Sequence, residues 1–129
     1  IDRANNSSKL RDIFNKKEIL TFLKSKKFKI VDPSKLKFLD EIKLFKRASF
    51  IIGMYGAGLT NLIFCNSKCK VIQLKNYNVD KMYENIAKKI GLKFYSIKGK
   101  NIKNQINDRN FDGLINIELR KLSFLLKKI

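Results

Sequence analysis

A run of six residues contains three glycines and could bind a phosphate group. This run, Gly53-Met54-Tyr55-Gly56-Ala57-Gly58, follows an apolar stretch and leads into a second one that opens with Leu59. Glycines leave room for backbone N–H groups to approach an anion, and the start of a helix adds about half a positive charge. Thr60 and Asn61 add side-chain hydrogen-bond donors. We therefore expect a phosphate site over residues 53–61, with a turn that needs glycine for tight helix packing as the alternative.

The order of the glycines argues against two other kinds of nucleotide site. The run has the pattern G-x-x-G-x-G, whereas the dinucleotide fingerprint is G-x-G-x-x-G with an acidic ribose-binding residue about 20 positions later. Gln73 occupies that later position, and its neutral amide is a weaker acceptor but a possible ribose contact. No Gly-Lys-Ser or Gly-Lys-Thr follows the glycines, so a Walker-type ATP site is excluded. The sequence favours a different nucleotide ligand.

The residue types that the chain lacks limit its chemistry further. It contains no histidine, so the Ser-His-Asp triad and the Cys-His pair are excluded. Cys65 and Cys69 are too few for a zinc site, and we expect them to be reduced and buried. We predict no metal site and no cofactor, and we assign no catalytic base. Four carboxylates are expected to lie on the surface or on helices: Asp32, Asp40, Glu41 and Glu84.

The apolar pattern predicts strands and helices in alternation. Helices are expected over about 16–26, where Asn15 and Glu18 resemble a capping box, and over 39–47, 59–64, 80–89 and 118–128. Strands are expected over 28–31, 50–52, 70–74 and 93–97, and a basic loop over 98–110. Such alternation predicts one α/β domain over residues 1–129, with a Rossmann-like three-layer αβα architecture and a parallel sheet.

A strong positive charge favours an anionic partner. The chain has 29 Lys and Arg against 11 Asp and Glu, a formal net charge of +18. A phosphorylated substrate, an anionic membrane and nucleic acid are all compatible with this charge, as is a merely Lys-rich composition. The lysines are scattered without the aromatic residues typical of RNA binding, so nucleic acid is the minor alternative. No run approaches the length of a membrane span.

At this point the motifs resemble a known family. The run Gly53-Met54-Tyr55-Gly56-Ala57-Gly58-Leu59-Thr60-Asn61 is similar to the Gly-x-His-Gly-Ala-Gly-Leu-Thr-Asn signature of family 61 glycosyltransferases, including the bacterial capsular polysaccharide type. Ile1-Asp2-Arg3 corresponds to the Ile-Ser-Arg start of their C-terminal domain. The resemblance extends from Ile1 to Leu74 and includes further matches at Asn15, Phe28–Val31, Leu44-Phe45, Ala48 and Val71-Ile72.

This resemblance implies half of a GT-B enzyme, in which two Rossmann-like domains face each other. Residues 1–129 would be the C-terminal nucleotide-sugar-binding domain of a longer chain whose N-terminal acceptor domain lies outside this sequence. The implied reaction transfers a sugar from a nucleoside-diphosphate sugar to a glycan or lipid-linked acceptor in surface polysaccharide biosynthesis, with inversion. We expect a cytoplasmic enzyme near the inner face of the membrane, and we expect the fragment alone to be inactive.

The resemblance also assigns the donor-binding residues. Arg3 would approach the donor phosphates, with Arg11 as a second candidate, because a guanidinium matches phosphate oxygens and neutralises a leaving diphosphate. The remaining donor-site candidates are Gly53, Tyr55, Gly56, Ala57, Gly58, Leu59, Thr60 and Asn61, with Gln73 as the ribose candidate.

Three positions depart from the family pattern. Tyr55 replaces the signature His, Asp2 replaces Ser beside Arg3, and Gln73 replaces the usual Glu. The first change removes an imidazole, the second adds a negative charge beside a proposed phosphate contact, and the third weakens ribose recognition. Two alternatives of other classes stay open, a non-catalytic nucleotide-binding or anion-binding module and an RNA-binding basic domain.

Overall fold

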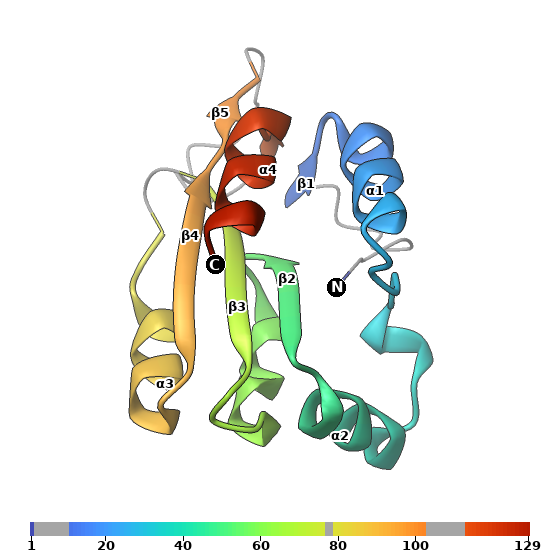
Figure 1. Ribbon diagram of the computed structural model, residues 1–129, viewed down its shortest axis with the longest axis vertical. Helices are drawn as coiled ribbons and strands as arrows, with labels where there is room; N and C mark the ends of the chain where they lie inside the picture. The colour runs from blue at the N-terminus through green and yellow to red at the C-terminus, as the bar shows by residue number, and fades with distance from the viewer. Residues whose placement is uncertain (2–10, 77–78, 103–112) are drawn as a thin grey trace.

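A three-stranded parallel sheet forms the centre of the computed structural model, which describes residues 1, 11–76, 79–102 and 113–129 (Figure 1). Its strands are β2 (Phe50–Met54), β3 (Lys70–Lys75) and β4 (Lys93–Lys98), in the order β2-β3-β4. The four central residues of β3 are buried. These strands confirm the three predicted over 50–52, 70–74 and 93–97, of which 50–52 has the unbroken apolar pattern of a strand covered on both faces.

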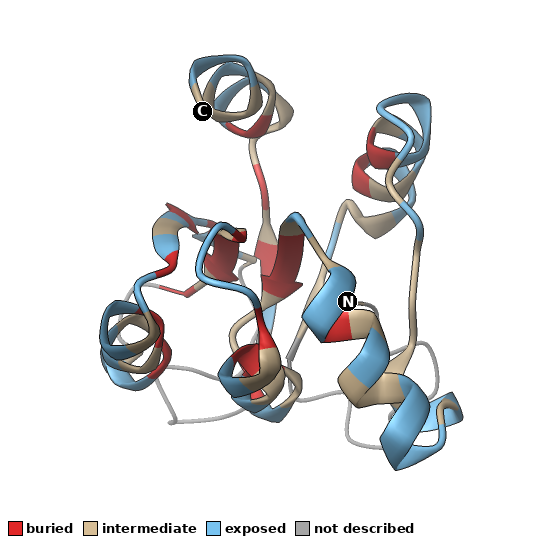
Figure 2. Cartoon of the chain, turned by 60° about the horizontal axis from the view of Figure 1, so that its bottom comes forward, coloured by how far each residue is buried: buried red, intermediate tan, exposed pale blue. Residues whose placement is uncertain are grey.

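Helices cover both faces of this sheet (Figure 2). One apolar core joins Ile51 and Val71 to α2 (Phe38–Arg47), to the 3₁₀ helix η2 (Ala57–Phe64) and to α3 (Met82–Ile90). The other core joins Ile52 and Ile72 to α1 (Lys16–Ser25) and α4 (Leu119–Lys128). This mixed α/β structure with parallel sheets is compatible with the predicted αβα fold. Alternate residues along each strand face opposite cores, as expected from the two-residue period of a strand.

A second, small sheet was not predicted from the sequence. It contains β1 (Arg11–Ile13), β5 (Lys100–Asn101) and β6 (Gly113–Asn116), in the order β1-β6-β5. β1 runs parallel to β6, and β5 runs antiparallel to it. Because these strands have two to four residues each, their local sequence carries too little periodicity to identify them. Most of the predicted basic loop, residues 103–110, lies outside the described residues.

The predicted strand over residues 28–31 is wrong. These residues are followed by the short 3₁₀ helix η1 (Pro33–Lys35), but they belong to neither sheet. Phe28 and Ile30 still pack against the core, and the ring of Phe28 makes an edge contact with Phe50 at 5.5 Å. A cavity separates this segment from β2, so none of the described strands lies where its backbone could pair.

The structure confirms the predicted glycine at the end of α3, but the predicted capping residue of α1 makes a different contact. Gly91 ends α3 in the left-handed conformation with φ of 85°, as expected for a glycine after a helix. Asn15 precedes α1 but its side chain makes no capping hydrogen bond. Instead its amide donates to the carbonyl of Ile117 at 2.7 Å and accepts from the Ile117 N–H at 3.0 Å. Asn15 therefore connects the start of α1 to the segment before α4.

Candidate functional site

The glycine-rich loop lies at the carboxyl end of the central sheet. Gly53 and Met54 are the last residues of β2 and lie opposite Gln73 and Leu74 of β3. The Tyr55 N–H continues the pairing by donating to the Leu74 carbonyl at 2.8 Å. The chain then enters η2 at Ala57. Ligands of open α/β sheets bind outside this carboxyl edge, so the fold places the loop where a donor site is expected.

The start of η2 offers two backbone donors. Gly56 is extended, with φ of 160°, and its carbonyl accepts from the Leu59 N–H at 2.9 Å to close the first turn. Ala57 and Gly58 precede that bond, and no described residue accepts a hydrogen bond from their N–H groups. Ala57 is exposed, whereas Leu59 is fully buried. The buried side of η2 therefore fixes the helix, while its first turn remains accessible to an anion.

Tight packing also explains two of the glycines. A Cβ atom added at Gly53 would lie 3.1 Å from Cδ2 of Leu59 and 3.5 Å from Cβ of Ile1. A Cβ atom added at Gly58 would lie 3.3 Å from Cγ2 of Ile1. The packing alternative raised by the sequence thus holds for these two positions, and it does not conflict with anion binding. The same lack of a side chain at Gly58 allows close packing and leaves its amide uncovered.

The polar side chains of the loop differ in accessibility. Thr60 is exposed, and its hydroxyl lies on the same helix as the two open amides. The Asn61 amide makes a short hydrogen bond to the carboxylate of Glu41 in α2. Glu41 thus occupies a donor that the sequence assigned to the ligand, and it places a negative charge beside the loop.

Tyr55 and Gln73 lie beneath the loop on the same face of the sheet. The ring of Tyr55 packs edge-on against Tyr83 of α3, with centroids 5.1 Å apart and planes at 70°. Gln73 is 2% exposed, and its Nε2 has no hydrogen-bond partner among the described residues. No ligand position is defined against this side chain, so the ribose contact stays a prediction.

The two arginine candidates cannot be placed against the loop. Arg3 lies outside the described residues. Arg11 begins β1, where its backbone pairs with Gly113 of β6, and its side chain also lies outside the description. Their proposed phosphate contacts therefore stay predictions.

Two lysines at the same sheet edge were missed by the sequence reasoning. Lys75 and Lys98 end β3 and β4 and lie opposite each other in register. By strand alternation both side chains point to the face that carries Gln73, η2 and α3. The sequence signal that could have identified these two lysines is a basic residue directly after the apolar part of each of two neighbouring strands. Adjacent like charges at a ligand-binding edge favour an anion there.

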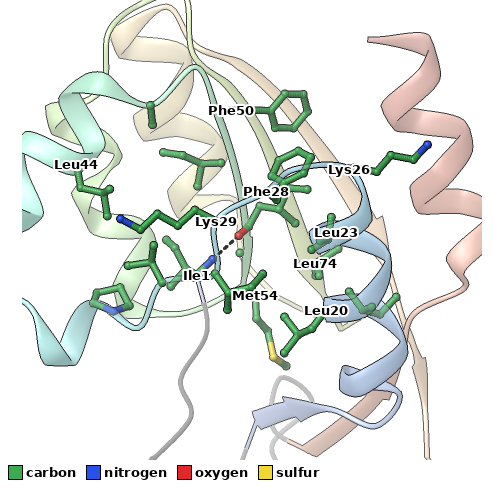
Figure 3. Close-up of a pocket in the computed structure, with 18 of the residues that line it drawn as sticks. Ile1, Leu20, Leu23, Lys26, Phe28, Lys29, Leu44, Phe50, Met54 and Leu74 are labelled. Carbon is green, nitrogen blue, oxygen red and sulfur yellow. Dashed lines mark hydrogen bonds between the residues drawn. The ribbon is translucent and has the colours of Figure 1, made fainter.

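An apolar cavity of about 480 Å³ borders the loop without covering it. It lies along β2 and is lined by Gly53 and Met54 at one end, by Ile1, and by residues 28–31 on the far wall (Figure 3). Residues 55–61 do not contribute to its lining. This cavity is therefore distinct from the surface presented by the start of η2.

The cysteines are buried beside η2 and take no part in the loop. Cys65 and Cys69 are both free thiols in the apolar core on that face. The hydrogen bond with Cys69, together with burial, raises the pKa of the Cys65 thiol. Within the described ranges, no three His, Cys, Asp or Glu side chains are grouped so that they could hold a metal ion. None of the helices in that part of the chain is long and apolar enough to cross a membrane.

Comparison with known proteins gives one family. Residues 1–72, which include the loop and η2, match the sequence model described as Glycosyltransferase 61. The chain is 31% identical over 100 residues to the EGF domain-specific O-linked N-acetylglucosamine transferase of Bos taurus, covering 74% of this chain and 19% of that protein. For the enzyme of the same name from Rattus norvegicus, identity is 32% over 91 residues, covering 67% and 17%.

A more distant relative agrees with these two. The transferase of the same name from Drosophila melanogaster is 28% identical over 90 residues, covering 67% of this chain and 17% of that protein. The chain therefore spans less than a fifth of the length of these curated relatives.

Proposed function

Because the chain belongs to the glycosyltransferase 61 family, we propose that it is the donor-binding part of an enzyme that transfers a sugar from a nucleoside-diphosphate sugar. The observation that carries this proposal is the pair of open N–H groups of Ala57 and Gly58 at the carboxyl end of β2, within the span that matches the family. The diphosphate would accept hydrogen bonds from these amides, with Thr60 beside them.

Cations complete the proposed diphosphate site. Arg3 is the first candidate by resemblance, and Lys75 and Lys98 are candidates from their position at the sheet edge. In the transfer step, an acceptor hydroxyl oxygen bonds to the anomeric carbon as the bond from that carbon to the diphosphate breaks. The hydroxyl proton passes to a base, which we place on the acceptor side of the full enzyme, and the electron pair leaves with the diphosphate. Amides and cations that bind this developing charge lower the barrier. Attack opposite the leaving group gives inversion.

The acceptor proposal follows the relatives. Their name states transfer of N-acetylglucosamine to EGF domains, so we propose an N-acetylglucosamine donor and a hydroxyl of a polypeptide as acceptor. A glycan or lipid-linked acceptor of surface polysaccharide synthesis is the second candidate, supported by the net charge of +18, which favours work at an anionic membrane. In that case the enzyme is cytoplasmic, at the inner face of the membrane. Flotation with acidic and neutral liposomes separates the two, since the second requires a preference for acidic lipid.

The arrangement of the full enzyme is part of the same proposal. Residues 1–129 would form the C-terminal half of a GT-B enzyme, and a preceding α/β domain would bind the acceptor. The fragment alone would then bind donor without transferring sugar. A non-catalytic nucleotide-binding module would differ, because its full-length chain would bind the nucleotide and still show no transfer.

Ala57→Pro tests the donor site with little change to the backbone. Proline is tolerated at the first position of a helix, and the preceding Gly56 is extended, as a residue before proline prefers. The substitution removes one proposed donor. A hydrogen bond to a charged group contributes about 1.5–3 kcal/mol, so we expect roughly ten- to hundredfold weaker binding of UDP and UDP-N-acetylglucosamine by calorimetry.

Ala57→Ser is the matched control, since it keeps the N–H group and should bind like the wild type. Arg3→Ala should also weaken binding, and Arg3→Lys should recover part of the loss. Equal affinity of Ala57→Pro, Ala57→Ser and wild type would show that the amide does not bind the diphosphate. Binding of RNA with a steep salt dependence, and no binding of nucleotide sugars, would favour the nucleic-acid alternative.

A further inference from the structure

In the part of the chain that the structure describes, one edge of β2 has no strand beside it. Among the described strands, the sole sheet neighbour of β2 is β3. The cavity of about 480 Å³ lies along the other edge, between β2 and residues 28–31. An open strand edge presents backbone N–H and C=O groups that normally pair with another strand or with water. Backbone groups at the open edge of β2 therefore need hydrogen-bond partners inside this cavity.

The hydrogen bonds between β2 and β3 identify the backbone groups that face this cavity. The Ser49 carbonyl accepts from the Lys70 N–H at 3.0 Å, and the Tyr55 N–H donates to the Leu74 carbonyl at 2.8 Å. Odd-numbered residues of this stretch thus pair with β3. The backbone groups of Phe50, Ile52 and Met54 point to the opposite edge, because successive residues of a strand alternate.

Ile1 already occupies one place at this edge. Its amino group donates to the Ile52 carbonyl at 2.6 Å, as the dashed line in Figure 3 shows. A Cβ atom added at Gly53 would lie 3.5 Å from the Cβ of Ile1, so Ile1 lies opposite Gly53 with its side chain on the same face. This register is the parallel one. An antiparallel pair made through the same hydrogen bond would set Ile1 opposite Ile52, with its side chain on the other face.

The cavity continues from Ile1 along the rest of β2. Its lining includes Phe50, Ile51 and Ile52, with Leu20 and Leu23 of α1 on one side and Phe45 of α2 on the other. Figure 3 shows Leu20, Leu23, Phe28 and Leu44 around the space next to Ile1. The lining also includes Lys26, Lys27, Lys29 and Arg47. The walls on both faces of the sheet layer are therefore mainly apolar, as they are around a strand in the middle of a parallel sheet.

We propose that the residues immediately ahead of Ile1 in the longer protein form a parallel β-strand in this cavity, hydrogen-bonded to the open edge of β2. The length of the relatives leaves room for such a segment, since this chain spans less than a fifth of them. Continuing the register backwards places the third residue ahead of Ile1 opposite Phe50. About four residues, Ile1 included, cover the edge from Phe50 to Gly53 at ~3.3 Å per residue.

The proposal specifies the chemistry of the segment. Because both walls are mainly apolar, the three or so residues ahead of Ile1 are expected to be apolar without alternation, and rich in Val, Ile or Leu. The inserted strand would also lie beside residues 28–31 and give that extended segment a partner. It would then extend the central sheet beyond β2 and hold Ile1 against Gly53 and Gly58, at the base of the proposed donor loop.

Residue-resolved hydrogen exchange on the full-length protein tests the pairing. The Ile52 amide would donate to the inserted strand, so it should exchange as slowly as the Ile51 and Gly53 amides, which face β3. The two β3-facing amides serve as the internal control. Exchange of the Ile52 amide at least a hundredfold faster than that of Ile51 would overturn the proposal, because it would show an edge without a strand.

A disulfide tests the register and the identity of the strand. Phe50→Cys is combined with cysteine at the third residue ahead of Ile1, which the register places directly opposite on the same face. The matched control moves that cysteine to the second residue ahead, which faces the other side. We expect an intramolecular bond in the first pair and not in the second, mapped by peptide mass spectrometry apart from Cys65 and Cys69.

A disulfide in both pairs, or in neither, would refute the proposed strand. A disulfide between two chains would also overturn the proposal, because it would assign the cavity to a second copy of the protein. These readouts do not depend on nucleotide binding. Failure of the strand proposal is therefore distinguishable from failure of the donor site.

Discussion

The side chain of Asn15 joins the start of α1 to the segment before α4, and its replacement by alanine tests how strongly the fold depends on this link. The amide donates to the Ile117 carbonyl at 2.7 Å and accepts from the Ile117 N–H at 3.0 Å. Ile117 is 0% exposed, so Asn15→Ala leaves two backbone groups of a buried residue without their partner.

The expected cost follows from those two groups. A buried backbone group that loses its partner costs about 1–3 kcal/mol. Asn15 itself is half-buried, so water can reach part of the gap, and we expect a loss of about 2–3 kcal/mol in the free energy of unfolding. For 129 residues the total stability is of the order of 6–19 kcal/mol, so the loss is a sizeable fraction.

Urea unfolding followed by circular dichroism measures this effect. Asn15→Asp keeps the acceptor for the Ile117 N–H but loses the donor to its carbonyl, so its stability should fall between the wild type and Asn15→Ala. Glu18→Ala removes the exposed 3.0 Å contact between Asn15 and Glu18 and should cost less than about 0.5 kcal/mol. If Asn15→Ala costs no more than Glu18→Ala, the link to Ile117 does not stabilise the fold as argued.

Three further substitutions or treatments test other contacts. Gly99→Ala would place its Cβ 2.8 Å from Cβ of Ile115, so we expect about 1–3 kcal/mol of destabilisation in urea unfolding, and a stability equal to wild type would contradict this contact. Lys88 lies 2.9 Å from Glu84 and lowers the pKa of that carboxyl. The pair should therefore contribute about 0.3–0.5 kcal/mol above the unfolded-state pKa of Glu, and this contribution is lost as pH falls through the lower folded value. Lys88→Ala should weaken this pH dependence in thermal melts, and the smaller effects of Lys81 and Lys75 on the Glu84 pKa should remain. Because the Cys65 thiol has a raised pKa and is buried, iodoacetamide at pH 8 should alkylate it far more slowly in the native protein than in urea, and equal rates would refute the burial.

The parts of the fold that depend on local residue patterns were predictable from the amino-acid sequence. The run at 50–52 predicted a strand of the central sheet because a strand buried on both faces lacks polar alternation, and the short apolar-rich segments at 70–74 and 93–97 predicted the other two. Amphipathic spacing predicted the helices, and Gly91 marked the end of α3. The order of the glycines after β2 placed the candidate loop at the carboxyl edge of the sheet. These signals are read from neighbouring residues, so they need no knowledge of the partner elements.

Features that depend on contacts between residues far apart in the sequence were not predictable from local patterns. Residues 28–31 have the composition of a strand, but a cavity rather than a strand lies beside them. Asn15 stands at the start of a helix, yet its amide binds Ile117, 102 positions away. The same holds for Gln73, buried beneath the loop, and for Lys75 opposite Lys98. Hydrogen bonding and burial depend on which residues are close in space. A local sequence pattern indicates which conformation a residue prefers, but it does not identify the distant residue that it contacts in the fold.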